Sequence, residues 1–433
     1  MATQTSTAAP AETAPIRTVH SPTLAIDEAV RARRAAGERV LHLGFGEAGL
    51  PVPDGVAAVL AGAARLGGYG PVAGSAAARE AAAGWFARRE LPTRPEQVIF
   101  APGSKPLLFA LLAALPGDVV LPRPAWVSYA AQSALTGKRV VGVPVPAEAG
   151  GVPDPELLEP ALREARAAGA DPRVLILTVP DNPTGTVARA EHLRAACAIA
   201  ERHGMAVIAD EIYAELTHDG TAPPRAADQL PERTVITGGL SKSMALGGWR
   251  IGFARLPDGP WGERLRAELT GVASEIWSAL AAPMQEVAAH VLGDPPEVLA
   301  HIASARALHA TVARAVHAEL VAAGARCRAP EAGFYLYPEL PEFPALPELP
   351  GQRPGGVAVA GALLERHGVG VLPGAAFGDD PAAPRVRVAT SLLYGETDEQ
   401  RWQALSTVAA GGDPVALPWI SDALAQLRAA LAR

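Results

Sequence analysis

Between residues 98 and 242, short apolar runs alternate with segments of helical character, and this alternation restricts the fold more than any other feature of the chain. The runs that we predict as strands span residues 97–100, 118–121, 138–144, 174–178, 206–209 and 234–237. Strands that alternate with helices form a mainly parallel sheet, which helices cover on both faces. The sequence therefore predicts an α/β protein built on such a sheet.

Polar or small residues follow the predicted strands at the points where the strands end. They are Gly103 with Ser104, Trp126, Asn182, Asp210 and Lys242. Because ligands of open α/β sheets bind at the carboxyl ends of the strands, we expect these residues to surround one site. Gly103 and Ser104 also precede a predicted helix, where free backbone N–H groups and the helix dipole favour a phosphate.

Each of these residues also has a plain structural explanation. Trp126 can belong to the core, and Asp210 can cap the next helix instead of meeting a buried cation. Lysines are usually solvated, but Lys242 follows a buried strand and lies among small residues, with Arg250 eight positions later. A lysine that is desolvated in such a place can act as an imine-forming amine.

Further candidates lie outside the alternating region. Residues 44–53 hold three glycines and two prolines, which marks either a plain connection or a loop whose backbone contacts a substrate. Tyr69, in the turn at 68–71, is a packing residue or a ligand contact. On the predicted strand 384–390, Arg385 and Arg387 share a face, and the commoner explanation is that both are solvated.

With 433 residues, the chain exceeds the size at which one core usually stops growing, so we expect two lobes. We divide it into a disordered tail (1–16), an N-terminal segment that joins the small domain (17–53), a large domain (54–300) and a small C-terminal domain (301–433). Within the last part we predict a strand at 330–337, a proline-rich surface loop at 338–356 and a final helix at about 419–431. That helix carries an apolar stripe, which we expect to dock on the body of the protein or on a partner subunit. The stripe consists of Ile420, Leu424, Leu427 and Leu431.

Composition excludes several classes of protein. Hydrophobic residues make up 49% of the chain and charged residues 19%, which is typical of a globular enzyme. The net charge of −7 argues against a nucleic-acid-binding surface, and no apolar run approaches the roughly 20 residues that a membrane span needs. Cys197 and Cys327 lie far apart without metal-type spacing, which favours a reducing compartment, and we expect a cytoplasmic protein without a metal site.

The order and spacing of the strand-end residues resemble those of a known family. Asp210 follows Asn182 by 28 residues, Lys242 follows Asp210 by 32, and Arg250 follows Lys242 by 8. From about residue 21 to 405, the chain is similar to the class I/II aminotransferases that use pyridoxal 5′-phosphate (PLP), in the bacterial aspartate and aromatic branch. The resemblance implies PLP-dependent transferase fold type I, with a mainly parallel, seven-stranded type of sheet in the large, PLP-binding domain and a smaller α+β domain. It also implies transfer of an amino group from an L-amino acid to a 2-oxo acid, by a ping-pong mechanism through pyridoxamine phosphate.

The resemblance assigns roles around the cofactor. Lys242 would form an imine with PLP and later move the proton of the substrate's α-carbon. Asp210 would pair with the pyridinium nitrogen, and Asn182 and Tyr213 would hydrogen-bond the phenolic oxygen. Trp126 would stack on the ring. Cofactor contacts, mostly to the phosphate, are further implied for Gly103, Ser104, Lys105, Ser241 and Arg250, and for Tyr69, which would reach the phosphate of the neighbouring subunit.

The resemblance also assigns substrate contacts. Arg387 would bind the α-carboxylate as a bidentate pair, and Gly46 belongs to the loop that closes over the substrate. Ser21, Thr23 and Lys105 match positions that recognise a distal carboxylate in the aspartate-using branch. Because the site would be shared between subunits, the resemblance implies a homodimer.

Several positions depart from the family pattern and leave the substrate open. The loop usually written Gly-Glu-Pro-Asp-Phe is Gly-Glu-Ala-Gly-Leu at 46–50, Asp181 replaces a usual asparagine, and Gly239 replaces a serine of some relatives. Glu275 and Trp277 would suit an aromatic or basic substrate. Alternatives are another PLP reaction, such as that of a β-lyase, cyclase or oxidase, and a transcription regulator, which would need an added helix-turn-helix domain.

Overall fold

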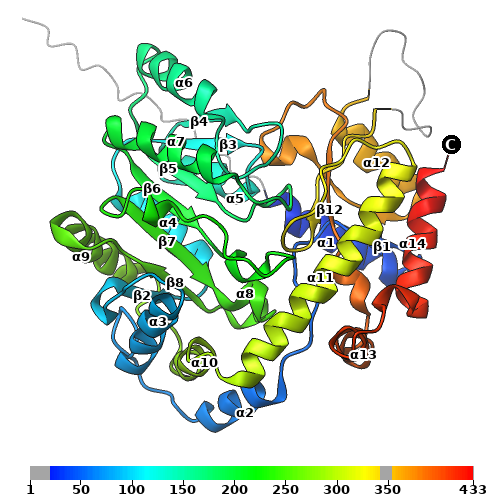
Figure 1. The fold of residues 1–433 in the computed structure, drawn as a ribbon, viewed down its shortest axis with the longest axis horizontal. Helices are drawn as coiled ribbons and strands as arrows, with labels where there is room; N and C mark the ends of the chain where they lie inside the picture. The colour runs from blue at the N-terminus through cyan, green and yellow to red at the C-terminus, as the bar shows by residue number, and fades with distance from the viewer. Residues whose placement is uncertain (1–19, 342–353, 433) are drawn as a thin grey trace, which may run out of the picture.

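The structure is a computed structural model, and it describes residues 20–341 and 354–432. The predicted tail at 1–16 and residues 342–353 of the predicted proline-rich loop lie outside the described residues. Helices flank a central sheet, and a second, smaller region lies beside it (Figure 1). In the part of the chain that the structure describes, no helix combines the length and the apolar character needed to cross a membrane.

The central sheet has seven strands in the order β2-β8-β7-β6-β5-β3-β4. Only β8 runs antiparallel to its neighbours, and every other pair is parallel. The expected mainly parallel sheet is confirmed, whereas β8 was not predicted because its four residues begin with a glycine and end with an arginine and so form no apolar run. The strands are β2 (Val98–Ala101), β3 (Asp118–Arg123), β4 (Val140–Pro144), β5 (Pro172–Thr178), β6 (Ala206–Asp210), β7 (Thr234–Gly239) and β8 (Gly252–Arg255).

Successive side chains of these strands point to opposite faces of the sheet and belong to two separate apolar clusters. On β5, Val174 and Ile176 join one cluster, while Leu175 and Leu177 join the other. Both clusters are closed by helices, so the strands are buried on both faces. The helices of this region are α2 (Asp54–Ala63), α3 (Ala76–Arg88), α4 (Ser104–Ala114), α5 (Val127–Leu135), α6 (Pro155–Ala167), α7 (Ala190–Arg202), α8 (Leu240–Ser243), α9 (Gly259–Ile276) and α10 (Ala282–Leu292).

The second region combines the two ends of the described chain around a third apolar cluster. β1 (Leu41–His42) pairs with β10 (Val369–Gly370), and β12 (Val386–Ala389) lies between β9 (Tyr335–Leu336) and β11 (Leu372–Pro373). Its helices are α1 (Pro22–Ala35), α11 (Pro296–Ala322), α12 (Gly356–His367), α13 (Asp398–Ala409) and α14 (Pro418–Leu431). The four residues of the predicted stripe on the last helix are buried, and α14 packs against α11.

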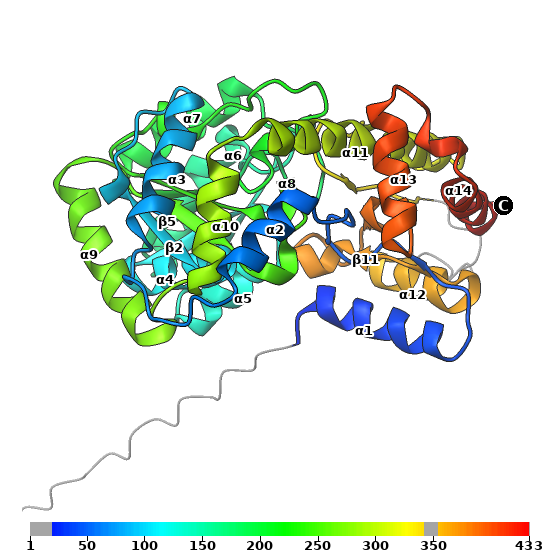
Figure 2. The same ribbon diagram turned by 90° about the horizontal axis from the view of Figure 1, so that it is seen from below.

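Helix α11 runs from the central-sheet region into the second region (Figure 2). Val298 and Ile302 belong to an apolar cluster of the central sheet, and Leu308 and Val312 belong to the third cluster. The predicted domain boundary at 300/301 therefore falls inside this helix, and the division into domains stays a prediction.

Two local predictions need correction. The predicted strand at 330–337 is reduced to β9, because Gly333 has a φ of 57° and its N–H bonds to the carbonyl of Leu216 instead of a neighbouring strand. From residue 263 to about 319 we expected a largely helical region with a break near residues 293–296, but the region forms three helices, because a second break lies between α9 and α10, where Ser278 has a φ of 62°.

Candidate active site

A cavity of about 430 Å³ lies at the carboxyl ends of β5, β6 and β7, where the second region meets the central sheet. The strand-end residues on which the sequence reasoning rested surround it, with the exception of Gly103. From the central-sheet region it is lined by Ser104, Lys105, Trp126, Tyr129, Thr178, Asn182, Asp210, Ile212, Tyr213, Ser241, Lys242, Gly247, Gly248 and Arg250. From the second region it is lined by Thr23, Leu24, Arg31, Phe45, Gly46, Glu47, Tyr335 and Arg387.

Asp210 ends β6 as a buried carboxylate with one free oxygen. Its Oδ2 accepts a hydrogen bond of 2.7 Å from the Tyr129 hydroxyl. Its Oδ1 is buried and accepts no hydrogen bond of normal geometry from the described residues, although the Ile212 N–H and the Thr237 hydroxyl lie close enough to lower the pKa slightly. Burial outweighs these contacts and raises the pKa of Asp210 to about 6. The carboxylate thus lacks a partner on the side of Oδ1.

Tyr129 is a site residue that the sequence reasoning missed. Its hydroxyl contacts both Asp210 and, at 2.9 Å, the Thr178 hydroxyl, and its ring lies 5.2 Å from that of Trp126 in an edge-to-face contact. The spacing could have revealed it, because residues three apart in a helix share a face. Trp126 immediately precedes α5, so Tyr129 follows it toward the same strand ends.

Lys242 lies in α8, directly after β7, and its Nζ donates a hydrogen bond to the carbonyl oxygen of Gly46. The same Nζ lies 5.9 Å from the ring centroids of both Tyr213 and Phe334. The Tyr213 hydroxyl is 2.9 Å from the hydroxyl of Tyr335, and burial raises the pKa of Tyr213. A Cβ on Gly46 would lie 2.3 Å from that Tyr335 hydroxyl, so only glycine fits at this contact.

The turn before α4 forms an anion-binding corner with Arg250. Gly103 has a φ of 96°, and a Cβ there would lie 2.3 Å from Nη2 of Arg250, so the turn admits no side chain. Ser104 is the first residue of α4, whose leading N–H groups have no partner within the helix. Arg250 itself bonds through Nη1 to the Gly247 carbonyl at 2.8 Å. Free N–H groups and a guanidinium together suit a phosphate.

Arg387, on β12, is fully buried, with 0% of its surface exposed. Its Nη1 donates to Oδ1 of Asn182 at 3.1 Å and its Nη2 to the carbonyl of Gly44 at 2.7 Å. The guanidinium carbon lies 4.7 Å from the Tyr335 ring centroid and 4.9 Å from that of Phe377. Its Nε has no hydrogen-bond partner among the described residues, and burial lowers the pKa of Arg387. A buried cation with a free donor favours an anionic ligand.

The remaining predicted substrate contacts are Lys105, Thr23 and Ser21, of which the first two line the cavity. Nζ of Lys105 is 5.2 Å from the centroid of the Trp126 ring, and burial, with the nearby charges of Arg250 and Lys242, lowers the pKa of Lys105. Thr23 lines the cavity, whereas Ser21 does not and instead lies 2.8 Å from the Thr23 hydroxyl. Arg31 of α1, which the sequence did not suggest, lines the same cavity.

Three predicted residues lie away from this cavity. The side chain of Tyr69 is 97% exposed and contacts nothing around Lys242 of its own chain. Glu275 is exposed near the end of α9, and Trp277 packs against the apolar cluster beneath α4 and α9. One chain therefore brings most, but not all, of the predicted residues together.

Asp181, the departure from the family pattern, faces away from the cavity. Its Oδ2 accepts hydrogen bonds from the hydroxyl of Thr184 at 2.6 Å and from its N–H at 3.2 Å. A Cβ on Gly150 would lie 2.2 Å from this Oδ2, so the segment around Gly150 covers the carboxyl. Burial raises the pKa of Asp181 to about 7.

Comparison with known proteins identifies the family. The family described as aminotransferase class I and II matches residues 39–397. The chain belongs to the class I and II aminotransferases. It is 34% identical over 397 residues to an aspartate aminotransferase of Geobacillus stearothermophilus, which covers 88% of this chain and 95% of the relative. It is 33% identical over 403 residues to an aspartate/prephenate aminotransferase of Cereibacter sphaeroides, covering 90% and 95% of the two chains.

Solved structures agree with this membership. The aspartate aminotransferase of Thermus thermophilus with maleate superposes with a TM-score of 0.76 at 28% identity, over 90% of this chain and 97% of that one. The protein is therefore a PLP-dependent enzyme of transferase fold type I, and it transfers an amino group between an amino acid and a 2-oxo acid.

The residues of this aminotransferase fit its cofactor. The buried Oδ1 of Asp210 has no hydrogen-bond partner among the described residues. A protonated pyridine nitrogen would be a suitable cationic donor for it. The corner of Gly103, Ser104 and Arg250 suits a phosphate, and Lys242 brings an amine to the same cavity, of the kind that PLP enzymes use. The carboxylate of Asp210, the corner with Ser104 and Arg250, and the amine of Lys242 thus border one cavity.

Proposed function

We propose that the amino donors and acceptors of this aminotransferase are acidic, with L-aspartate or L-glutamate as donor. The observation that carries the proposal is that Lys105 and Arg387 line the same cavity, so that two carboxylates can meet separate cations. The names of the relatives support it, since those relatives are aspartate and aspartate/prephenate aminotransferases. Thr23, with Ser21 behind it, would add hydroxyl donors to the distal carboxylate.

We propose the following contacts to PLP. The Asp210 carboxylate accepts a hydrogen bond from the pyridine nitrogen through its free Oδ1, while Tyr129 holds Oδ2. The N–H groups at Gly103 and Ser104, with Arg250 and Ser241 nearby, would hold the phosphate. Asn182 and Tyr213 would hydrogen-bond the ring hydroxyl, and Trp126 would stack on the ring.

When bound, PLP supplies a ring that takes up the electrons released at the substrate's α-carbon. In our proposal, the amine of Lys242 then removes the proton from that carbon and returns one to the cofactor side. Arg387 binds the α-carboxylate as a bidentate pair, in which its free Nε is available as one of the two donors. Gly46, whose carbonyl holds Lys242 in the structure, closes the cavity on the side of the second region and helps to exclude water.

We also infer that two copies form the active unit. Tyr69 is 97% exposed, and Leu66 and Ile276 are likewise exposed apolar residues. A partner that covers this surface would receive Tyr69 at its own phosphate corner, as the family resemblance implies. Light scattering should give twice the mass of one chain, and a fully active monomer would contradict the inference. The cytoplasmic location stays a prediction, which the free thiols of Cys197 and Cys327 support.

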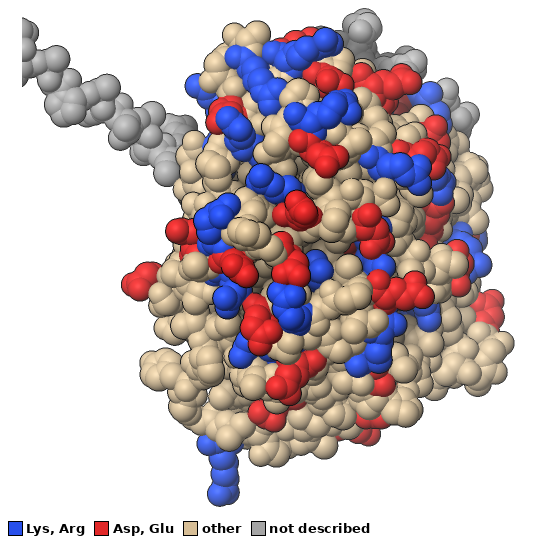
Figure 3. All heavy atoms as spheres, turned by 60° about the vertical axis from the view of Figure 1, so that its left-hand side comes forward, with Lys and Arg blue, Asp and Glu red and all other residues tan. Residues whose placement is uncertain are grey.

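The charged residues on the surface agree with a small-molecule substrate. Acidic and basic side chains alternate over the face seen in Figure 3 and do not gather into one basic stripe. A stripe of that kind would be expected for a nucleic-acid partner.

A screen of amino donors against several 2-oxo acids tests the proposal. We expect kcat/KM for L-aspartate to exceed that for L-phenylalanine by about tenfold or more, because only the acidic donor engages Lys105. The change Lys105→Met should remove this preference. The matched change Lys138→Met should keep it, since Nζ of Lys138 donates to the carbonyls of Leu115 and Gly117 and Lys138 does not line the cavity. Equal rates for acidic and aromatic donors would contradict the acidic assignment, and release of a 2-oxo acid without an aminated product would indicate another PLP reaction.

A further inference from the structure

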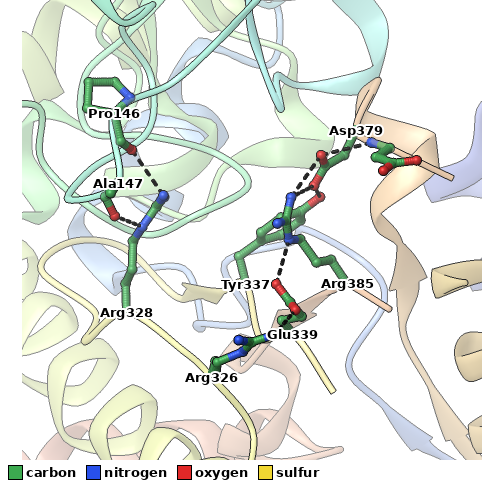
Figure 4. A network of polar contacts seen from close by, with 9 residues as sticks. Pro146, Ala147, Arg326, Arg328, Tyr337, Glu339, Asp379 and Arg385 are labelled. Atoms are coloured by element: carbon green, nitrogen blue, oxygen red, sulfur yellow. Dashed lines mark hydrogen bonds and ion pairs between the residues drawn. The ribbon is translucent and has the colours of Figure 1, made fainter. Parts of the chain in front are cut away.

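A chain of ion pairs surrounds Arg385, which precedes Arg387 by two residues. Nη1 of Arg385 lies 3.1 Å from both carboxylate oxygens of Asp379, and its Nε donates to Oε2 of Glu339 at 3.1 Å. Nη2 of Arg326 donates to the other oxygen of Glu339. The Tyr337 hydroxyl donates to Oδ2 of Asp379 at 2.9 Å. Figure 4 shows these side chains converging on Asp379 and Glu339 from four separate parts of the chain.

Asp379 is the buried end of this network. Its side chain is only 8% exposed, compared with 38% for Arg385 and 67% for Arg326. Ion pairs between exposed groups contribute little to the free energy of folding. A buried carboxylate that loses its cation destabilises the fold, because its charge stays out of water without a partner. Of the pairs in this network, we therefore expect the contacts of Asp379 to stabilise the local structure most.

These contacts hold one short turn, the 3-10 helix η5 (Gly374–Phe377) and the residues after it. The N–H of Gly374 bonds to the carbonyl of Arg385 at 2.7 Å, and the N–H of Asp379 bonds back to the carbonyl of Gly374 at 3.3 Å. A Cβ on Gly374 would lie 2.6 Å from the Tyr337 hydroxyl, so the turn packs directly against the residue that binds Asp379. The turn is thus held by backbone hydrogen bonds to Arg385 and Asp379, the two residues whose side chains form the ion pair, and it packs against Tyr337.

The turn carries Phe377, which connects it to the active site. The Phe377 ring lies 4.9 Å from the guanidinium carbon of Arg387, and its carbonyl accepts a hydrogen bond of 3.0 Å from the N–H of Ala125. Ala125 immediately precedes Trp126. Phe377 therefore touches Arg387 through its ring and the loop of Trp126 through its backbone.

We propose that Asp379 is a positioning residue for substrate binding, which acts by fixing Phe377 beneath the guanidinium of Arg387. The proposal rests on the proposed function, in which Arg387 binds the α-carboxylate. A bidentate pair requires a defined orientation of the guanidinium plane, and a displacement of about 1 Å weakens such contacts strongly. Every substrate carries this carboxylate, so Asp379 acts on all donors and acceptors alike.

The change Asp379→Asn tests this inference. It removes the charge that Arg385 needs and keeps the volume of the side chain. We expect KM to rise about tenfold for L-aspartate, L-phenylalanine and a 2-oxo acid, while kcat changes by less than about twofold. The dissociation constant of maleate, followed by the absorbance of the holoenzyme, should rise by the same factor.

Two further comparisons distinguish positioning from a general loss of stability. The matched control is Asp258→Asn, which breaks an exposed pair with Arg94 at 2.6 Å and 2.9 Å and should leave KM unchanged. The double change Asp379→Asn with Arg385→Gln should raise KM no further than the more severe of the two single changes. The reason is that both single changes break the same ion pair, the one between Asp379 and Arg385. If Asp379→Asn fails to fold, Tyr337→Phe, which removes one bond to the same carboxylate, should give a smaller rise in KM.

An unchanged KM and an unchanged maleate dissociation constant in Asp379→Asn would overturn the inference, as would a rise for one substrate only. The failure of the proposed function has a different signature. If the wild type turns over acidic and aromatic donors at equal rates, the acidic assignment is wrong, while the comparison of KM for every donor and of maleate binding between wild type and variant still tests the position of Arg387.

Discussion

Replacing Lys242 by alanine should lower kcat by more than about 10⁴-fold, because the same amine holds the cofactor and moves the proton of the α-carbon. The protein should still fold, since Lys242 only partly fills the cavity and its Nζ makes one hydrogen bond to Gly46. The measurement is single-turnover kinetics with L-aspartate, together with the visible absorbance of the purified protein before and after borohydride.

The chain allows an unusually direct control for this prediction, because it contains only three lysines, Lys105, Lys138 and Lys242. After borohydride reduction and proteolysis, the mass of the cofactor should be found on the peptide of Lys242. The variant Lys138→Ala should keep both the label and the activity. A label on Lys105, or full activity of Lys242→Ala, would disprove the assignment.

The change Asp210→Asn should lower kcat by about 10³-fold and weaken the retention of PLP. An amide has nearly the same shape and can still accept the hydrogen bond from Tyr129, but it carries no charge to stabilise a protonated pyridine nitrogen. Activity assays and equilibrium dialysis of PLP would measure the two effects.

The pH dependence adds a second readout for Asp210. Burial raises the pKa of its carboxyl to about 6 in the protein without PLP, so the carboxylate that the cofactor needs is lost as the pH falls. The advantage of the wild type over Asp210→Asn in PLP affinity should therefore shrink below pH 6. Titration of the phosphate affects both proteins equally and cancels in this comparison.

The matched control is Asp181→Asn. Asp181 is also a buried aspartate with a raised pKa, but it bonds to Thr184 and faces away from the cavity. This variant should keep its activity and its PLP. Equal losses of activity and of PLP in Asp181→Asn and Asp210→Asn would contradict the assignment, because they would show that Asp210 only stabilises the fold.

The alternation of strands and helices predicted the sheet, and the strand ends predicted residues that line the cavity. Asn182, Asp210 and Lys242 follow from local order, because the ends of parallel strands share one edge of a sheet. The antiparallel strand β8 could not be predicted, since its four residues carry no distinctive pattern.

The contacts that complete the site depend on tertiary packing and lie beyond such reasoning. Alternation along the strand placed Arg385 and Arg387 on one face, yet the first joins an ion-pair network while the second is fully buried beside Tyr335 and Phe377. No local pattern distinguishes the two arginines. Tyr335 was missed for the same reason, because its role depends on Tyr213, which lies 122 residues earlier in the chain.

The pairing of β1 with β10 has a consequence for how the protein is made. Leu41 pairs with Val369, so a strand that leaves the ribosome early must wait for more than 300 residues before its partner exists. Contacts with such large sequence separation form slowly, because the intervening chain must first be ordered. The central sheet, whose strands all lie between these two, can assemble during synthesis, whereas the side of the cavity that Arg387 lines can form only after β10 and β12 have been made.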